Sequence, residues 1–178
     1  MKNIWVLCHS RLYLLIITQG IYLSLLNYIL VSAGEPPSDN HKNVFKMSMP
    51  NVTTSTPDGY LCTAFDIRTV SNTPIYVTGF HPDAEALKAH HMLLHTCNVP
   101  YKQEKGSSWD CMMAPTCQDQ ASIIYGWARN ADNLKLPDGV SFTLDPEEKN
   151  YLVLQVHYAE VIKQPDSSGI TLELSQKP

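Results

Sequence analysis

Short runs of β-branched and aromatic residues, separated by turn-forming residues, constrain the fold of this chain more than any other sequence feature. The runs are 61–67, 75–80, 122–128, 140–144, 151–158 and 170–174. Turn signals such as Asn72-Thr73-Pro74, Pro137-Asp138-Gly139 and Ser168-Gly169 lie between them. This spacing predicts an all-β fold, an antiparallel β-sandwich of the jelly-roll-like kind. With 178 residues, 44% of them hydrophobic, the chain is long enough for one core.

The N-terminal residues differ in composition from the rest of the chain. Lys2 and Arg11 precede a nearly uninterrupted apolar stretch, residues 12–31, which the small residues Ser32 and Ala33 follow. This pattern is typical of a secretory signal peptide, residues 1–33, cleaved after Ala33. The stretch is also long enough to remain as an uncleaved membrane anchor. In either case we expect the folded part of the chain to enter the secretory lumen.

The residues after the signal divide into a leader and a domain. Residues 34–43 contain two prolines and few apolar groups, which predicts a flexible leader, and the folded domain is expected to span residues 44–178. The formal net charge of the chain is −4, and its Lys and Arg residues do not cluster. This charge distribution disfavours nucleic acid as a partner.

Cysteines and one glycosylation motif fit a secreted domain. The cysteines that follow the predicted signal are Cys62, Cys97, Cys111 and Cys117. They predict two disulfides, and their spacing leaves all three pairings open. A zinc ribbon is disfavoured because no Cys-x-x-Cys pair is present. The sequon at Asn51-Val52-Thr53 predicts N-glycosylation of Asn51 on the surface.

Two adjacent histidines, His90 and His91, precede an apolar run. A buried pair of imidazoles needs hydrogen-bond or metal partners. Helix formers in 83–89 permit a helix that places His91 and His95 four residues apart, but Met92 stands where a zinc peptidase needs its glutamate. In the extended alternative, His90 begins a strand. Neighbouring side chains on a strand point apart, so shared metal ligation by the pair then requires a local irregularity.

A third histidine, His157, lies in the run 151–158. The period of two predicts a core face formed by Leu152, Leu154, Val156 and Tyr158. Gln155 and His157 then project from the opposite, more polar face, where an accessible metal ligand can stand. A lone histidine there is otherwise an ordinary surface residue. Gln155 is predicted either to position water or substrate beside a metal or to face solvent.

Several separate segments carry a family resemblance. They are Met49-Pro50-Asn51-Val52-Thr53, Tyr60-Leu61-Cys62, His90-His91-Met92-Leu93-Leu94, Cys97-Asn98-Val99-Pro100, Trp127-Ala128-Arg129-Asn130-Ala131, Leu136-Pro137-Asp138-Gly139-Val140 and Leu154-Gln155-Val156-His157-Tyr158. In this order they resemble the first domain of the peptidylglycine α-hydroxylating monooxygenases, which depend on copper and ascorbate. The resemblance extends from about residue 44 to the end of the chain.

The resemblance implies a copper site, its redox partner and a disulfide pairing. It assigns one copper, at the so-called H site, to His90, His91 and His157, with ascorbate as the reductant. Imidazole binds both oxidation states of copper, and Cu(I) accepts low coordination numbers. It also implies that Cys62 pairs with Cys111 and Cys97 with Cys117. A further bridge of the family is expected to be absent, because Ser167 replaces one of its cysteines.

The resemblance also leaves several residues outside the copper site. His95 stands where the family carries an apolar residue, and Met92 is expected in the core. His41 and His81 are expected to face solvent. The family's second domain, which supplies the second copper and the clamp for the peptide, is expected to be absent from these residues.

Two functions follow as hypotheses. In the first, the chain is the electron-transfer part of a peptidylglycine monooxygenase, which hydroxylates the C-terminal glycine of peptides as a step toward amidation. Its partners are then glycine-extended peptides, oxygen and ascorbate, in the secreted state or the lumen of secretory granules. A membrane is involved only if the N-terminal segment stays uncleaved. In the second, the chain is a secreted copper-binding module without turnover.

Overall fold

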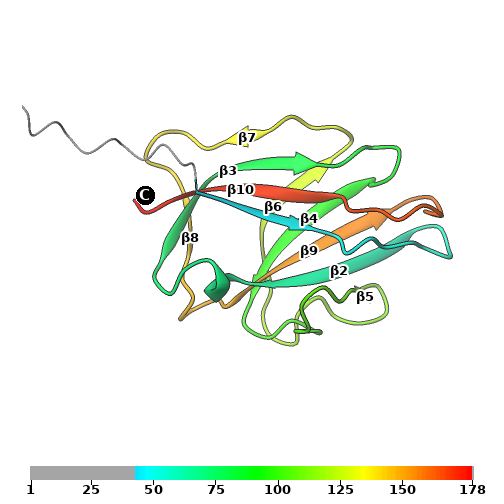
Figure 1. Ribbon diagram of the computed structural model, residues 1–178, viewed down its shortest axis with the longest axis horizontal. Helices are drawn as coiled ribbons and strands as arrows, with labels where there is room; N and C mark the ends of the chain where they lie inside the picture. Colours follow the sequence, from blue (N-terminus) through cyan, green and yellow to red (C-terminus); the bar gives the residue numbers. More distant parts are fainter. Residues whose placement is uncertain (1–42, 178) are drawn as a thin grey trace, which may run out of the picture. The chain divides into compact units, whose positions relative to one another are not determined.

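The computed structural model describes residues 43–177, which form an all-β fold of two antiparallel sheets (Figure 1). The predicted signal, residues 1–33, and the leader up to residue 42 lie outside the described residues. One sheet contains β1 (Asn43–Ser48), β10 (Gly169–Ser175), β3 (Ile75–Asp83) and β7 (Leu134–Lys135) in that order, and β8 (Phe142–Leu144) also pairs with β3. The other contains β5 (Trp109–Asp110), β2 (Gly59–Asp66), β9 (Tyr151–Tyr158), β4 (His91–Cys97) and β6 (Ser122–Ala128). The antiparallel all-β prediction is confirmed.

The core lies where apolar side chains of the two sheets pack together. The four residues predicted for the core face of β9 are all fully buried: Leu152, Leu154, Val156 and Tyr158. Met92 and Leu94 of β4 and Ile170 and Leu172 of β10 belong to the same cluster. Burial of one such side chain contributes about 1.5–3 kcal/mol, so β9 is held firmly in place by its inner face.

The strand predictions succeed where the apolar pattern is continuous. The predicted runs 122–128 and 151–158 coincide with β6 and β9. The run 140–144 shortens to Phe142–Leu144, because Val140 still belongs to the turn in which Gly139 adopts φ 78°. The helix-forming stretch from Asp83 to Ala89 makes only one turn, in which Ala89 N–H donates to the Glu85 carbonyl. Tertiary pairing of β4 with β9 overrides the local helix preference.

Residues 98–118 form a segment that covers part of the outer face of the β9 sheet. Two disulfides fasten it, Cys62–Cys111 and Cys97–Cys117, so the pairing implied by the resemblance is confirmed. Cys62, Cys97 and Cys117 form a second buried cluster with Trp109 and Val153, against which Cys111 packs. Val153 is fully buried on the outward side of β9. We call residues 98–118 the stapled segment.

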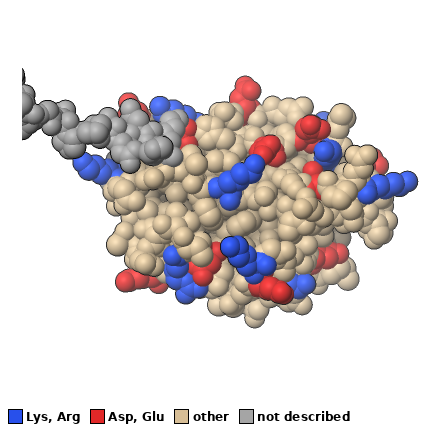
Figure 2. All heavy atoms as spheres, viewed as in Figure 1, with Lys and Arg blue, Asp and Glu red and all other residues tan. Residues whose placement is uncertain are grey.

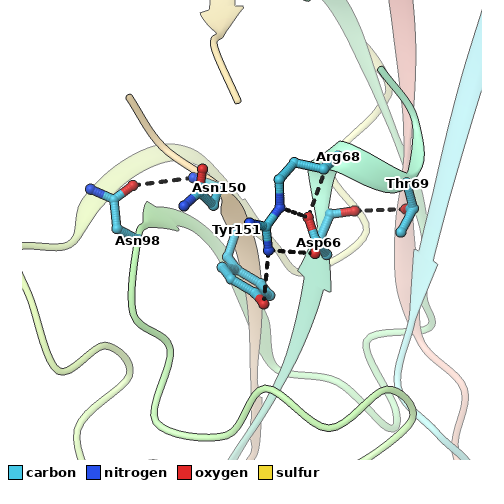
Figure 3. A network of polar contacts seen from close by, with 6 residues as sticks. All are labelled: Asp66, Arg68, Thr69, Asn98, Asn150 and Tyr151. Carbon is cyan, nitrogen blue, oxygen red and sulfur yellow. Dashed lines mark hydrogen bonds and ion pairs between the residues drawn. The ribbon is translucent and has the colours of Figure 1, made fainter. Parts of the chain in front are cut away.

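A polar network fixes the end of β2 against the start of β9 (Figure 3). The Asp66 carboxylate accepts hydrogen bonds from the Arg68 side chain at 2.7 and 2.8 Å and caps the short 3-10 helix η1 (Ile67–Thr69). Arg68 also donates to the Tyr151 hydroxyl at 3.3 Å. Beside it, Asn98 accepts a hydrogen bond from the backbone of Asn150, which ties the stapled segment to this corner.

Gly169 begins β10 at a point of close backbone approach to β1. A Cβ atom added there would collide with the carbonyl oxygen of Met47 and with Cα of Ser48. We expect Gly169→Ala to lower the free energy of unfolding by about 1–3 kcal/mol, because the obstacle is backbone that cannot rotate away. Urea unfolding measures the loss. Gly126→Ala is the control, since its Cβ meets only the end of the Leu93 side chain at 3.4 Å. Equal losses in the two variants would contradict the close approach.

Two surface features bear on partners of the domain. No helix within residues 43–177 is long and apolar enough to cross a membrane. On the face shown in Figure 2, basic and acidic side chains are interspersed.

Candidate metal centre

His90, His91 and His157 come together at one end of β4 and β9. His91 is the first residue of β4 and lies directly opposite His157 on β9. His90 precedes the strand, in a bend, and its backbone N–H donates to the carbonyl of His157 at 2.8 Å. Because His90 lies outside the regular strand, its side chain escapes the alternation that would point it away from His91. The local irregularity that shared ligation requires is therefore present.

The Nδ1 atoms of the three imidazoles face one another. His91 Nδ1 lies 3.2 Å from His90 Nδ1 and 3.3 Å from His157 Nδ1. One ligand atom from each histidine lies within 4.8 Å of those of the other two. Nitrogen ligands about 2 Å from a common ion stand roughly 3–4 Å apart, so these separations suit a shared metal ion.

The chemistry of the donors also fits a cation. A neutral imidazole carries a proton on only one of its two nitrogens. Among three adjacent Nδ1 atoms of neutral imidazoles at least two are alike, so either two lone pairs or two N–H groups face each other. A metal ion removes this repulsion by accepting all three lone pairs. Imidazole nitrogen is a good ligand for copper, so the residues present fit the metal that the resemblance implies.

The distal nitrogens of two of these histidines have charged neighbours. His157 Nε2 lies 3.3 Å from the Asp58 carboxylate, and His90 Nε2 lies 3.2 Å from a terminal nitrogen of the Arg129 guanidinium. The ring of Tyr60 stacks on His157, with ring centroids 4.3 Å apart. Sequence reasoning assigned no role to these three neighbours. Tyr60 and Arg129 lay within the family-like segments, but Asp58 lay outside them.

The centre is less open than the alternation of β9 suggested. His157 is 8% exposed, so the expectation of an accessible ligand on a polar face is wrong for this residue. Tyr60 covers His157 on one side, and the stapled segment covers Val153 on the same face. Burial lowers the pKa of His91, and the neighbouring His157 and His90 lower it further. A lowered pKa keeps His91 neutral, which is the form that binds a metal.

Gln155 lies beneath the stapled segment. Its side-chain nitrogen is 3.4 Å from the Thr116 hydroxyl and 3.5 Å from Cys111 sulfur. The residue is half-buried, so its side chain contacts the stapled segment and only part of it faces solvent. These contacts connect the strand that carries His157 to the disulfide Cys62–Cys111, and a role beside a metal stays a prediction.

The remaining predicted residues divide between core, surface and undescribed parts. Met92 is fully buried, as expected. His81 was expected to face solvent but is half-buried, because its ring contacts the buried carboxylate of Glu173 at 2.6 Å. His41 lies outside the described residues. Asn51 is exposed, and its side chain accepts a hydrogen bond from Ser167, while its glycosylation stays a prediction.

A second group of candidate ligands consists of Cys97, Cys117 and Asp119. The two sulfurs form a disulfide, and the Asp119 carboxylate accepts hydrogen bonds from the backbone of Asn98 and Val99. These atoms therefore hold the stapled segment in place and are not available as metal ligands.

His95 lies farther along β4 and is 8% exposed. Neither of its ring nitrogens has a hydrogen-bond partner among the described residues. Its register partner on β9 is Val153, so it belongs to the same face as His91 and His157. Burial lowers the pKa of His95. The folded protein therefore holds this imidazole neutral at a pH where the unfolded chain protonates it.

We expect His95 to weaken the domain in acid. The pKa in the unfolded chain is about 6.5 and the folded pKa is lower, so the unfolded state binds more protons below that pH. The free energy of unfolding should then fall by up to about 1.4 kcal/mol per pH unit below about pH 6.5. Urea unfolding at a series of pH values, for the native chain and His95→Leu, isolates this contribution. The variant should lose less stability between about pH 6.5 and pH 5, and parallel curves would contradict the assignment.

Comparisons with known proteins agree with this geometry. Residues 45–165 match the family model described as copper type II ascorbate-dependent monooxygenase, N-terminal domain. Peptidyl-glycine alpha-amidating monooxygenase B of Xenopus laevis is 42% identical over 132 residues, which cover 71% of this chain and 14% of that protein. The peptidyl-glycine alpha-amidating monooxygenase of Mus musculus is 38% identical over 147 residues, covering 80% of this chain and 14% of its own length. The chain thus spans only a small part of the relatives it matches.

Proposed function

Because the chain belongs to the copper type II ascorbate-dependent monooxygenase family, we propose that it is the electron-transfer copper domain of a peptidylglycine monooxygenase. The observation that carries this proposal is the convergence of the three Nδ1 atoms of His90, His91 and His157. These atoms would hold one copper ion. When bound, copper supplies a centre that takes one electron at a time from ascorbate and passes it on.

The chain's own residues prepare this site in three ways. The hydrogen bond from the His90 backbone N–H to the His157 carbonyl oxygen fixes the backbones of the two residues relative to each other. Burial keeps His91 neutral, so its Nδ1 lone pair is available. The Tyr60 ring covers one face of His157 and limits access of water. The three imidazoles are therefore brought together by the fold itself, before a metal arrives.

The complete reaction that we propose for the whole protein is hydroxylation of the C-terminal glycine of a peptide, a step toward amidation. Its partners would be glycine-extended peptides, oxygen and ascorbate. The resemblance places the second copper on a His-x-His pair and a methionine of a second domain, and no His-x-His pair occurs in this sequence. The two disulfides support a place in an oxidising compartment, and we propose a secreted or secretory-granule protein glycosylated at Asn51.

Ascorbate reduction of the copper-loaded chain tests the electron-transfer role. We expect the Cu(II) paramagnetic resonance signal of the chain to disappear on mixing with ascorbate and to return with an oxidant. The same sample, given oxygen and a peptide that ends in glycine, should yield no hydroxylated peptide by mass spectrometry. Positioning of substrate beside a reactive metal normally supplies several kcal/mol of the barrier reduction, and that machinery is assigned to the second domain.

Both the reduction assay and the peptide assay can contradict the proposal. A bound Cu(II) that ascorbate fails to reduce would remove the electron-transfer role and leave a copper-binding module without turnover. Hydroxylated peptide in several turnovers per chain, above a metal-free control, would show that the 178 residues are an enzyme by themselves.

A further inference from the structure

We propose that Asp58 and Arg129 set the tautomers of two metal-binding histidines in opposite senses, so that Asp58 prepares His157 for the metal whereas Arg129 must leave His90 when the metal binds. The inference rests on the copper site proposed above. It assigns roles to two positioning residues that lie outside the ligand set. Both act through the nitrogen atoms that point away from the centre.

Asp58 favours the metal-binding tautomer of His157. An ionised carboxylate only accepts hydrogen bonds, so the contact of 3.3 Å requires that His157 Nε2 carry the proton. In a neutral ring the lone pair then lies on Nδ1, the atom that faces His91. Carboxylates commonly orient histidine ligands in this way and make them more basic.

The position of Asp58 is well defined although its side chain is 75% exposed. Its backbone adopts φ 54° in the left-handed region, and its N–H donates to the carbonyl of Ala159 at 3.2 Å. Asp58 directly precedes β2, and β2 pairs with β9 up to the Gly59–Tyr158 pair, one residue beyond His157. The strand register thus brings the carboxylate to His157 from 99 residues away.

Arg129 favours the opposite tautomer in His90. A guanidinium only donates hydrogen bonds, so the contact of 3.2 Å requires a lone pair on His90 Nε2. In a neutral ring the proton then lies on Nδ1, where it points toward His91 Nδ1 at 3.2 Å. In this form His90 cannot ligate a metal through Nδ1.

Metal loading must therefore change His90 but not His157. The proton of His90 passes through solvent from Nδ1 to Nε2, and the lone pair moves to Nδ1. An Nε2–H group no longer accepts from Arg129, so the guanidinium loses its contact and leaves the ring. Arg129 is exposed, which gives it room to move. The positive charge of Arg129 is also repelled by an incoming cation, which favours its departure from the His90 ring.

Nitrogen-15 NMR of the metal-free chain at about pH 8, where free imidazoles are neutral, reads the tautomers directly. We expect His157 to carry its proton on Nε2 and His90 on Nδ1. In Arg129→Met, which keeps an unbranched side chain without the charge, His90 should shift to the Nε2–H form. With Cu(I) bound to the native chain, both rings should be in the Nε2–H form. A native His90 already in that form, or a His157 protonated on Nδ1, would overturn the proposal.

Copper affinity gives a second readout. Asp58→Gly tolerates the positive φ and removes the carboxylate, and it should weaken copper binding by roughly 10- to 100-fold. Asp58→Asn, which keeps an acceptor but no charge, should lie between Asp58→Gly and the native chain. Arg129→Met should bind copper roughly three- to tenfold more tightly, because no hydrogen bond has to be broken. Asp138→Asn, in the turn before β8, controls for the loss of a surface charge and should have no effect.

The outcomes separate this inference from the proposed function. A native chain that fails to bind copper contradicts the copper site itself. A native chain that binds copper, together with Asp58→Gly and Arg129→Met variants of unchanged affinity and unchanged tautomers, contradicts only the roles of Asp58 and Arg129.

Discussion

Replacing His157 with alanine is expected to lower the copper affinity of the chain at least about a hundredfold. Loss of a residue that merely supports a ligand costs about 10- to 100-fold, and His157 is proposed as a ligand itself. Its removal leaves two nitrogens and also removes the stacking partner of Tyr60. The hydrogen bond from the His90 backbone N–H to the carbonyl oxygen of residue 157 survives the substitution, so the rings of His90 and His91 should keep their positions.

Equilibrium dialysis against a copper buffer measures this loss. His81→Ala is the matched control, because His81 also contacts a carboxylate through its ring but belongs to β3 of the other sheet. The fold of the His157 variant should remain intact, since the core side of β9 is untouched. Native affinity and stoichiometry in His157→Ala would exclude His157 from the site.

Removing the Cys62–Cys111 disulfide is expected to cost about 4 kcal/mol of the free energy of unfolding. The two residues are 49 positions apart, so the bridge restricts a long loop of the unfolded chain. Cys97 and Cys117 are 20 positions apart, and loss of that bridge should cost less, about 3 kcal/mol. Both cysteines of a bridge are replaced by alanine in each variant, because a single replacement leaves a reactive thiol.

Urea unfolding of the two double variants tests this ordering. Both bridges lie in the buried cluster with Trp109 and Val153, so each variant also loses sulfur packing to a similar extent. The difference between the variants therefore isolates the loop length. A loss below about 1 kcal/mol for the longer loop would show that the stapled segment is held by packing and not by the bridge.

Much of the fold was predictable because its strands have clear periodicity. The alternation in 151–158 identified the core side of β9 correctly, since sheet pleating alone determines which residues share a face. The same pattern said nothing about what covers the other side. Val153 and His157 are buried there by the stapled segment and by Tyr60, which are distant in sequence. The open polar face was therefore predicted wrongly.

The metal centre was predictable only in part. The ligand set came from the family resemblance, whereas periodicity alone placed His90 and His91 on opposite faces. The bend at His90 brings the Nδ1 atoms of His90 and His91 to 3.2 Å. It depends on a main-chain hydrogen bond from His90 to β9 that no local sequence pattern indicates. Asp58 was missed for a similar reason, because its contact with His157 depends on the register of β2 with β9.

X-ray absorption at the copper edge of the copper-loaded chain tests the central claim most directly, because it identifies the atoms around the metal. We expect one copper per chain with a first shell of imidazole nitrogens only, from His90, His91 and His157. Multiple scattering from the rings counts the imidazoles, and three are expected in the Cu(I) form. A sulfur atom in the first shell, from Met92 or from Cys97 and Cys117, or a shell with fewer than two imidazoles, would contradict the site.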